Sequence, residues 1–375
     1  MDLLERLQLA PGAEVVLAGV GQEPGVHVVG GAVRDVLLGR VPHELDLVVE
    51  GDAVAVARRA ASRLGGRLTV HERFGTATVA GDGFAFDLAG ARRERYARPG
   101  ALPDVELGAT LDEDLARRDF TVNAMAVRLA DGAFVAWPGA RQDLHAGVLR
   151  ILHARSFSDD PTRILRLARY AARLGFQPDA QTDALIDPAL FATVSGDRLG
   201  RELRLLLEEP HPARQLARHG IGQALLGDEF EPVDIAASPL AELAACCTRI
   251  AGLADRLDEL GFPARERKIV VAAARGAAEL RETLGDEGDA AVWRAFRRLP
   301  AEAAEVLAAG GGPAAQAARR WLDDVRHRRL AITGDDLVAA GLTGAAVGEA
   351  LERAMVAMLE GVAPDRDSQL TAALG

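Results

Sequence analysis

Two acidic residues in the N-terminal third of the chain have a spacing that suits metal binding. Glu44 and Asp46 lie in the apolar segment 44–49, which predicts a β-strand, and residues two apart on a strand point to the same face. Two carboxylates on one face can hold Mg²⁺ beside the phosphates of a substrate, and Asp87, after a second apolar stretch, could supply a third. Three carboxylates around two metal ions suit in-line nucleotidyl transfer. A solvated acidic face is the alternative reading of the pair.

A glycine pair could bind phosphate a few residues earlier. Gly30 and Gly31 separate an apolar segment that predicts a strand, 26–29, from a predicted helix at 32–38. Without side chains, the backbone N–H groups can approach a phosphate, and the N-terminus of the helix favours its negative charge. Arg34 lies one turn into the helix and could add a charge-assisted hydrogen bond. The alternative is a tight turn without a ligand.

Two further segments combine charged and amide side chains. Arg117, Arg118 and Asn123, in the sequence Arg-Arg-Asp-Phe-Thr-Val-Asn-Ala, could reach a triphosphate and a ribose hydroxyl, or the segment could simply begin a helix. In the second segment, Asp160 and Arg163 stand at the head of a helix, where they could hydrogen-bond the edge of a nucleobase. Arg163, Arg166, Arg169 and Arg173 fall within about a third of that helix's circumference, which is also typical of a solvated face.

The elements that must position these residues indicate an α+β fold. Strands are predicted at 26–29, 44–49, 67–71, 76–79 and 84–88, and helices at 32–38 and, after an Asp52 cap, 53–64. From Asp160 onward only helices are predicted, interrupted by glycine- and proline-rich breaks. The pattern therefore predicts an N-terminal α/β head on a long helical body.

Composition limits the classes of protein further. The chain has 375 residues, a net charge of −11 and 49% hydrophobic residues, which is typical of a globular protein. The negative charge does not exclude a nucleic acid, because binding needs only a local basic surface. No apolar run reaches the ~18 residues of a membrane span, and the first residues lack the pattern of a secretory signal. Cys246 and Cys247 are adjacent and suit neither a disulfide framework nor a metal site, so we expect a cytoplasmic protein.

The order and spacing of these motifs resemble the class II tRNA nucleotidyltransferase and poly(A) polymerase family, whose members build or repair the 3′ CCA end of tRNA without a template. The resemblance extends over residues 28–39, the acidic segment, 92–96, 114–126, 143–150, 159–176, 195–203, 333–337 and 341–351. It implies a polymerase-β-like nucleotidyltransferase head at 1–140. An all-helical neck at 141–208, body at 209–310 and tail at 311–375 would follow, with the tail binding tRNA.

The resemblance implies Mg²⁺ as cofactor and CTP and ATP as substrates. The expected partner is the acceptor arm and 3′ end of tRNA, and no association with a membrane is expected. The resemblance also implies roles for individual residues. Asp87 as a third carboxylate is a geometric inference from the strands. The predicted nucleotide-binding residues are Gly30, Gly31, Arg34, Arg117, Asn123, Asp160, Arg163, Arg166 and Arg169, and the predicted catalytic residues are Glu44, Asp46 and Asp87, of which Glu44 and Asp46 bind the metal.

The chain departs from the family pattern in three places. Glu44 stands where an aspartate is usual, Asp159 where a glutamate is usual, and residues 136–140 read Ala-Trp-Pro-Gly-Ala where the family has Asp-Pro-x-Gly-Gly. That last motif is associated with the head movement that accompanies the switch from CTP to ATP. Addition of only CC or only A, poly(A) synthesis and a non-catalytic RNA-binding role are therefore the alternatives to addition of the whole CCA.

Overall fold

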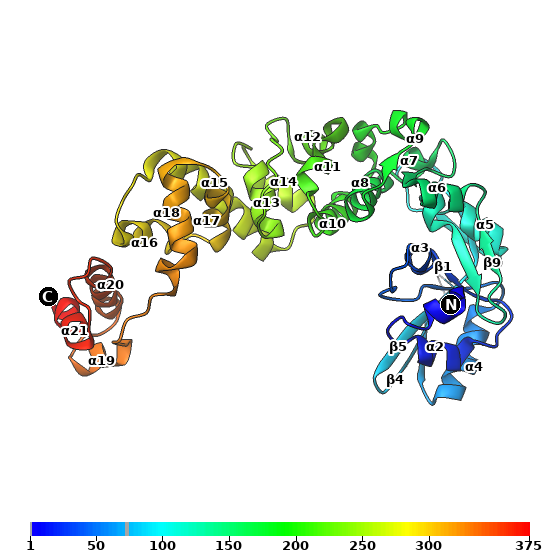
Figure 1. Cartoon of the computed structure of the whole chain (residues 1–375), viewed down its shortest axis with the longest axis horizontal. Helices are drawn as coiled ribbons and strands as arrows, with labels where there is room; N and C mark the ends of the chain where they lie inside the picture. The colour runs from blue at the N-terminus through cyan, green and yellow to red at the C-terminus, as the bar shows by residue number, and fades with distance from the viewer. Residues whose placement is uncertain (1, 72–74) are drawn as a thin grey trace. The chain divides into compact units, whose positions relative to one another are not determined.

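The computed structural model describes residues 2–71 and 75–375. Its chain forms two compact units, Met1–Ser195 and Gly196–Gly375 (Figure 1). The first contains every predicted nucleotide-binding and catalytic residue, and the second is helical. The division into head, neck, body and tail at 140, 208 and 310 stays a prediction.

A seven-stranded mixed sheet organises the first unit, in the order β3-β4-β5-β2-β1-β8-β9. Only β2 and β5 run parallel among its neighbouring strands, with Leu47 opposite Leu88. This register places Asp46 and Asp87 side by side, each directly before a paired leucine. The strands are β1 Val26–Val29, β2 Leu47–Val49, β3 Arg67–His71, β4 Thr76–Gly81, β5 Phe84–Gly90, β8 Met125–Arg128 and β9 Phe134–Ala136.

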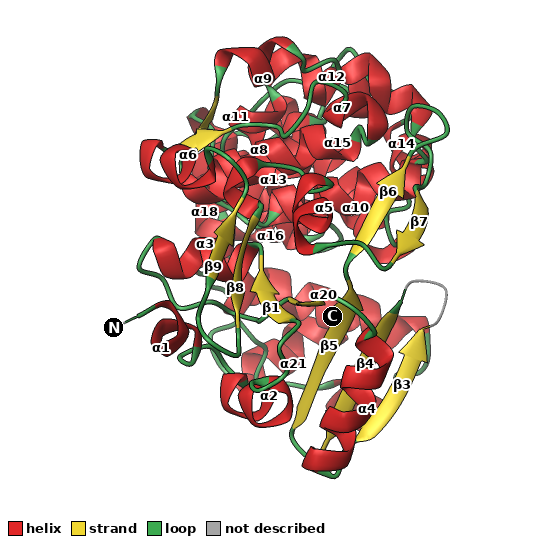
Figure 2. Ribbon diagram, turned by 90° about the vertical axis from the view of Figure 1, so that its right-hand side faces the viewer, coloured by secondary structure: helices red, strands yellow, loops and turns green. Residues whose placement is uncertain are grey.

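Helices pack on this sheet and extend beyond it. Helix α4 lies against β4 and β5, and α2 packs on α4 (Figure 2). As predicted, Asp52 caps α4, accepting a 2.9 Å hydrogen bond from the Ala55 N–H. The helices of this unit are α1 Leu3–Leu7, α2 Ala13–Val20, α3 Gly31–Leu37, α4 Ala53–Leu64, α5 Leu111–Ala116, α6 Ala140–Ala146, α7 Ser156–Asp159, α8 Thr162–Leu174 and α9 Ala180–Ala184, with 3-10 turns at Thr121–Asn123 and Pro188–Thr193. Two small sheets pair β6 Arg92–Arg95 with β7 Asp104–Leu107, and β10 Val148–Leu149 with β11 Gln177–Pro178.

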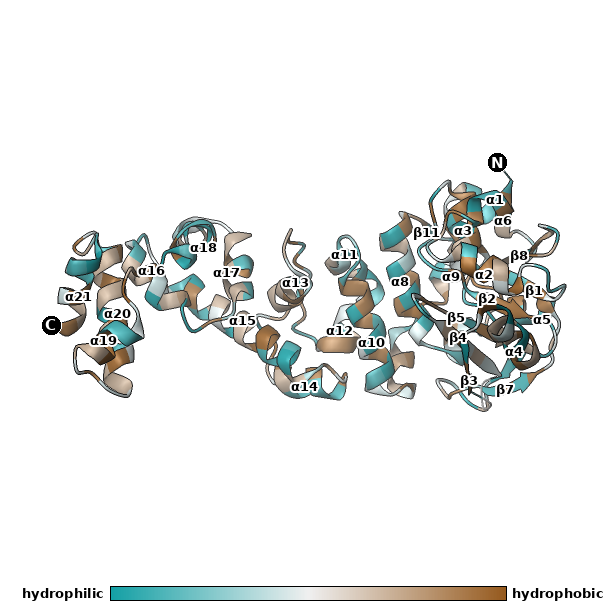
Figure 3. Ribbon diagram, turned by 90° about the horizontal axis from the view of Figure 1, so that it is seen from below, coloured by the Kyte–Doolittle hydropathy of each residue, from teal (hydrophilic) through white to brown (hydrophobic). Residues whose placement is uncertain are grey.

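The second unit is built from short amphipathic helices. Helix α10 buries Leu199, Leu203 and Leu206 at helical spacing, while Arg201 is exposed, and this alternation is visible in Figure 3. The helices are α10 Gly196–Leu207, α11 Pro212–Leu216, α12 Ile221–Leu226, α13 Pro239–Cys246, α14 Leu253–Glu259, α15 Ala264–Thr283, α16 Asp289–Phe296, α17 Ala301–Ala308, α18 Gly312–Asp323, α19 Gly334–Ala339, α20 Ala345–Leu359 and α21 Arg366–Leu374, with 3-10 turns at Arg218–Gly220 and Val325–His327. Within residues 2–71 and 75–375, no helix combines the length and apolarity that crossing a bilayer would require.

The structure confirms the α+β class, with the sheet in the N-terminal part and helices after it. It corrects the predicted strand at 44–49, which begins only at Leu47. Strand β1 ends at Val29, where the chain turns into α3, so Glu44 and Leu45 have no neighbouring strand to pair with. It also corrects the expectation of helices alone after Asp160, because the break after α8 contains β11, which pairs with β10.

Candidate active site

The three predicted carboxylates line one pocket of about 590 Å³. Glu44 and Asp46 lie in the segment that precedes β2, and Asp87 lies on β5. Asp46 is exposed at the pocket, but the protein atoms around it partly desolvate its carboxylate and raise its pKa, and the neighbouring charge of Glu44 raises it further. The Arg118 guanidinium opposes both effects without cancelling them. Two carboxylates with too little positive charge near them form a place where a bound cation is favoured.

The Asp87 carboxylate already forms a hydrogen bond with a neighbouring threonine. The Thr78 hydroxyl donates a 2.5 Å hydrogen bond to Asp87 Oδ1 across the β4–β5 pair. Among the described residues, no group of three histidine, cysteine, aspartate or glutamate side chains is close enough to hold a metal ion. The structure thus brings Asp87 to the same pocket as Glu44 and Asp46 without forming a ready three-carboxylate cluster.

The glycine turn lies where β1 runs into α3. Gly30 has a φ of +69°, a backbone conformation that favours glycine, and a Cβ atom there would lie 2.9 Å from Nη1 of the flexible Arg118 side chain. Gly31 begins α3, and a Cβ added to it would approach Arg34 Nη2 at 3.6 Å. The Arg34 side chain is buried, and it donates hydrogen bonds to Asn123 Oδ1 at 2.7 Å and to Asp35 Oδ1 at 2.9 Å.

Asp119 joins this turn to α8. Its carboxylate accepts hydrogen bonds from Asn123 Nδ2 at 3.0 Å and from Arg166 Nε and Nη2 at 2.8 and 2.6 Å. Burial alone would raise the pKa of Asp119, but the Arg166 charge and the Asn123 and Arg166 hydrogen bonds lower it to about 2. Asp119 therefore remains ionised and fixes the positions of Asn123 and Arg166.

Three arginines surround the ring of Tyr170. The guanidinium carbons of Arg34, Arg166 and Arg169 lie 5.3, 5.6 and 5.5 Å from the ring centroid. Phe120 packs edge-on against the same ring, 5.8 Å between centroids. The structure thus gathers predicted nucleotide-binding residues from α3 and α8 into one positively charged cluster beside the glycine turn.

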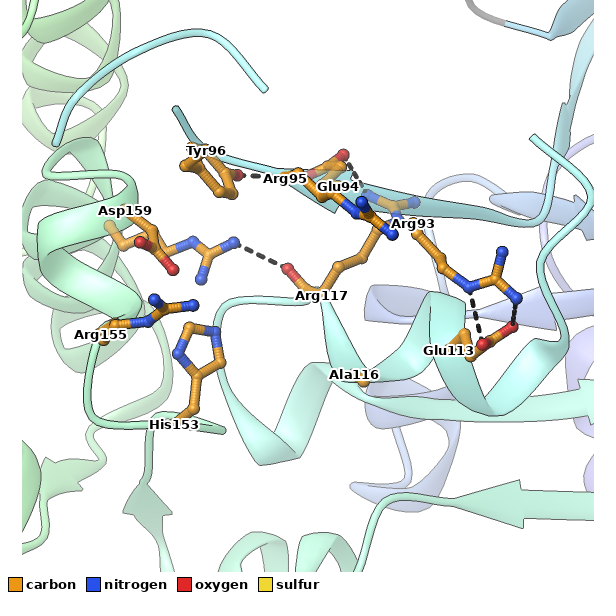
Figure 4. Close-up of a pocket in the computed structure, with 11 residues that line it drawn as sticks. Arg93, Glu94, Arg95, Tyr96, Glu113, Ala116, Arg117, His153, Arg155 and Asp159 are labelled. Carbon is orange, nitrogen blue, oxygen red and sulfur yellow. Dashed lines mark hydrogen bonds and ion pairs between the residues drawn. The ribbon is translucent and has the colours of Figure 1, made fainter. Parts of the chain in front are cut away.

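Arg117 occupies a position between two pockets. It lines the carboxylate pocket and also a second pocket of about 530 Å³, drawn in Figure 4. Its Nε donates to Asp114 Oδ1 and its Nη1 to Glu94 Oε1, both at 2.9 Å. Arg163 Nη2 donates a 2.7 Å hydrogen bond to the carbonyl oxygen of Arg117.

The predicted base-reading pair is engaged within the protein. Arg163 is buried, and its Nη1 donates to Ser156 Oγ at 2.7 Å, while Asp160 Oδ1 accepts from the Thr162 N–H and hydroxyl at 3.1 and 2.7 Å. Both residues stand at the start of α8, as the sequence predicts, but a role for either in contacting a base stays a proposal.

Comparison with known proteins identifies the head. Residues 26–150 match the model of the poly A polymerase head domain. The chain is 43% identical over 219 residues to an A-adding tRNA nucleotidyltransferase from Halalkalibacterium halodurans, covering 55% of this chain and 51% of that protein. It is 42% identical over 214 residues to a CC-adding tRNA nucleotidyltransferase from Deinococcus radiodurans, covering 55% of this chain and 57% of that protein. These matches span about half the length of the relatives.

A structural likeness extends over the whole chain. A Thermotoga maritima CCA-adding enzyme complexed with tRNA is 26% identical, with a TM-score of 0.79 over 100% of this chain and 98% of that one. Residues 26–150 thus match a poly A polymerase head domain, and the chain is similar to tRNA nucleotidyltransferases in sequence and to a CCA-adding enzyme in structure. Nucleotidyltransferases of this kind use a divalent metal, and Glu44 and Asp46 suit one, because such a cation is commonly held by one or two carboxylates together with substrate phosphates.

Sequence reasoning missed two residues of this candidate site. Asp119 fixes the arginine cluster and Glu94 orients Arg117, whereas Arg118, which lies near Asp46 and Gly30, was predicted with Arg117. Arg118 and Asp119 directly follow Arg117, so their place in the same charged run was a signal. Tyr170 lies one helical turn after Arg166, on the face that the arginine stripe already marked.

Proposed function

We propose that the chain is a template-independent tRNA nucleotidyltransferase that adds or repairs the 3′ CCA end of tRNA from CTP and ATP. The observation that carries this proposal is the adjacent pair Glu44 and Asp46 in a pocket that also contains Arg117 and Arg118. It supports a cation site next to the glycine turn and the arginine cluster. Both parts are needed for transfer of a nucleotide from a triphosphate.

The reaction joins the 3′-hydroxyl oxygen of tRNA to the α-phosphorus of CTP or ATP, and the bond to the β-phosphate oxygen breaks, releasing pyrophosphate. Mg²⁺, when bound, would lower the pKa of the attacking hydroxyl and neutralise the triphosphate. Glu44 and Asp46 would hold this cation, and Asp87, one strand away, would supply a further acceptor. The backbone N–H of Gly31 would hold the triphosphate, whereas the predicted Gly30 N–H donates to the Met125 carbonyl oxygen at 3.0 Å and Gly30 serves to form the turn.

The arginine cluster would neutralise the remaining phosphate charge. Arg34, Arg166 and Arg169 gather on Tyr170 from two helices, and the Asp119 carboxylate beside them offsets only part of their charge. Asn123 is held by Arg34 and Asp119, which directs its amide toward the same region, where a ribose hydroxyl could bind. Asp160 and Arg163 would select cytosine and adenine by hydrogen bonds to the base edge, and Arg117 would contact the same nucleotide.

The remaining proposals concern the partner and the location. The helical second unit, Gly196–Gly375, would bind the acceptor arm of tRNA through backbone and shape contacts, the way in which helical RNA is mostly recognised. The division at 140, 208 and 310 would separate head, neck, body and tail. We propose a cytoplasmic location, where tRNA and reduced cysteines occur together.

Addition of only the terminal A is the second candidate. The relative from Halalkalibacterium halodurans, named as A-adding, shares 43% identity with this chain. The sequence Ala-Trp-Pro-Gly-Ala at 136–140 also lacks the acid of the motif associated with the switch from CTP to ATP.

Nucleotide selectivity tests the proposal. Purified protein would receive a tRNA transcript that ends before CCA, Mg²⁺ and one of the four nucleoside triphosphates or a mixture of CTP and ATP, and pyrophosphate release would be measured. On this transcript we expect release with CTP and more with the mixture of CTP and ATP, but none with ATP, GTP or UTP alone and none after addition of a chelator. A long product with ATP alone would indicate a poly(A) polymerase. No release under any condition would leave an A-adding enzyme or a non-catalytic relative, and a CC-ended transcript with ATP separates these two, because only the A-adding enzyme extends it.

A further inference from the structure

A line of positive charge follows the solvent side of α15, the longest helix of the second unit (Figure 1). Arg265, Lys268 and Arg275 are exposed on this 20-residue helix. At 3.6 residues per turn, the three positions fall within about a quarter of the helix circumference. The buried residues Val270 and Ala277 lie on the other side, where α15 packs on α13 and α17. The three cations therefore face away from the core of the unit.

A fourth cation lies beside this line. A Cβ atom at Gly276 would lie 2.8 Å from Leu299 Cδ1, so the segment that follows α16 packs directly on α15, next to Arg275. Arg298, which precedes Leu299, is exposed. The surface called here the α15 basic face consists of Arg265, Lys268, Arg275 and Arg298.

No side chain of this face is neutralised within the protein. Among the residues at 2–71 and 75–375, none forms a hydrogen bond, an ion pair or a ring contact with any of the four. Neighbouring arginines are paired, Arg267 with Asp258 and Arg297 with Glu352. The unit contains 29 acidic and 22 basic residues, so the unpaired cations do not result from a shortage of acids. Their charge is available to an anionic ligand.

The face has a defined length. Because each residue of a helix rises 1.5 Å, the three positions from Arg265 to Arg275 extend over about 15 Å. Glu279 lies one turn further on the same side, and Glu282 follows it, so the charge changes sign there. A line of positive charge with this length is limited to the first three turns of α15.

This form suits a polyanion with regular spacing. The phosphates of a duplex strand recur about every 3 Å along its axis, so a straight row of cations about 15 Å long can contact several of them. Arginine and lysine contacts to phosphates fix the position of a nucleic acid without reading its sequence.

The composition of α15 favours double-helical RNA over other anionic partners. None of its twenty residues, all of which the structure describes, is an aromatic residue on which an unpaired base would stack. No large apolar side chain of the helix is exposed, whereas a helix that lies on a membrane inserts such side chains among the lipids. The proposed reaction also supplies a duplex, the acceptor arm of tRNA.

We infer that the α15 basic face binds the phosphate backbone of the double-helical acceptor arm of tRNA. This inference rests on the proposed function, and it names the side chains with which the second unit holds that substrate. Arg265, Arg275 and Arg298 donate hydrogen bonds to phosphate oxygens, and Lys268 contributes a compact positive charge.

The amine of Lys268 reports on this face directly, because Lys268 is the only lysine of the chain. Wild-type protein is treated with the N-hydroxysuccinimide ester of acetic acid, and mass spectrometry follows acetylation of Lys268 with and without a tRNA transcript. We expect saturating tRNA to slow this acetylation about tenfold, and added salt to remove the protection. A hairpin of the acceptor arm without an unpaired 3′ end should protect Lys268 equally, because the face contacts paired RNA.

Substitutions test the contribution of single charges. The dissociation constant of the transcript is measured at a series of salt concentrations for wild type, Arg275→Ala, Lys268→Ala and Lys268→Arg. Each alanine variant should bind about fivefold more weakly and lower the slope of log affinity against log salt by about 1, while Lys268→Arg should retain both values. Arg281→Ala is the matched control, because Arg281 is an exposed arginine on another side of α15, and it should bind as wild type does.

Three results would overturn the inference. The first is acetylation of Lys268 at the same rate with and without RNA, and the second is equal weakening of binding by Arg281→Ala and Arg275→Ala. The third is stronger protection of Lys268 by polyglutamate or by vesicles of anionic phospholipid, at the same charge concentration, which would indicate an acidic protein or a membrane surface. A wild-type protein that transfers no nucleotide, but in which tRNA still protects Lys268, would reject the proposed function and retain the basic face.

Discussion

Asp46 lies exposed beside a second carboxylate, where a bound cation is favoured. Partial desolvation and the charge of Glu44 both raise its pKa, and Arg118 compensates only in part. Residues that are chosen for stability alone rarely leave two carboxylates in this condition, whereas pKa shifts of this kind concentrate at functional sites. Glu44 and Asp46 are therefore the residues on which the chemistry depends most directly.

Replacing Asp46 by asparagine should abolish most nucleotide transfer without unfolding the protein. Loss of a metal-binding carboxylate removes several kcal/mol of transition-state stabilisation, so we expect kcat to fall by about 10²-fold or more. Because the substitution also removes repulsion from Glu44, the melting temperature should stay the same or rise. Equal kcat in Asp46→Asn and wild type would contradict the assignment. Glu44→Asp, which restores the residue usual in the family, serves as the matched variant and should remain active.

The environment of Asp119 stabilises its negative charge, in contrast to the environment of Asp46. We expect Asp119→Asn to lower the free energy of unfolding by about 2 kcal/mol at neutral pH, less than the ~3–5 kcal/mol of a fully buried pair, because the Arg166 side chain keeps 30% exposure. The folded pKa of about 2 lies below the ordinary 3.8, so this stabilisation is complete above pH 3.8 and is lost as the pH falls toward 2. Denaturant unfolding at a series of pH values should show the difference from wild type shrinking between pH 4 and pH 2. A difference independent of pH in that window would rule out the ionised pair as its source.

At the scale of elements, the sequence correctly predicted the helices and strands that depend on neighbouring residues alone. Asp52 caps the start of α4, and the segments predicted as strands at 26–29 and 67–71 correspond to β1 and β3. The start of β2 could not be predicted, because it depends on where β1 turns into α3. Strand β8 follows the 3-10 turn at Thr121–Asn123 and is fixed by pairing with β1, a contact distant in sequence, and β9 in turn pairs with β8.

The candidate site shows the same limit. Residue types and spacing indicated Glu44, Asp46, Arg34 and the arginines of α8, because these lie in short motifs. Arg34 and Arg166 both contact Tyr170, and Asp119 lies between them. These contacts depend on the packing of α3 against the start of β8 and on the position of α8. They are tertiary contacts, which no periodicity in the sequence predicts.

Helix α10 offers a test of packing within the second unit. A Cβ atom at Gly200 would lie 1.7 Å from the carbonyl oxygen of Leu260, which directly follows α14. We therefore expect Gly200→Ala to destabilise the protein by about 2–3 kcal/mol, because the two segments must separate. Gly348 on α20 is exposed with no atom near its Cβ position, and Gly348→Ala should stabilise by up to about 1 kcal/mol. Equal unfolding free energies for the two variants, measured in denaturant, would contradict this packing.

At the scale of the whole molecule, the chain combines a net charge of −11 with a proposed anionic partner. The first unit resolves part of this conflict, since Arg34, Arg166 and Arg169 gather around one ring and Arg155 has no acidic partner among the described residues. Positive charge is thus concentrated by folding rather than by composition, which is why the overall charge was a poor guide to the partner.

The most direct measurement uses three tRNA transcripts that end before the CCA, after C and after CC. Each is incubated with purified protein and Mg²⁺ and with CTP, ATP or both, and the products are sized on a sequencing gel. The account predicts extension of the transcripts to a complete CCA end and no further, with extension of the CC-ended transcript by ATP as the minimal result. Extension of none of the three transcripts, by a protein that remains folded and binds tRNA, would contradict it.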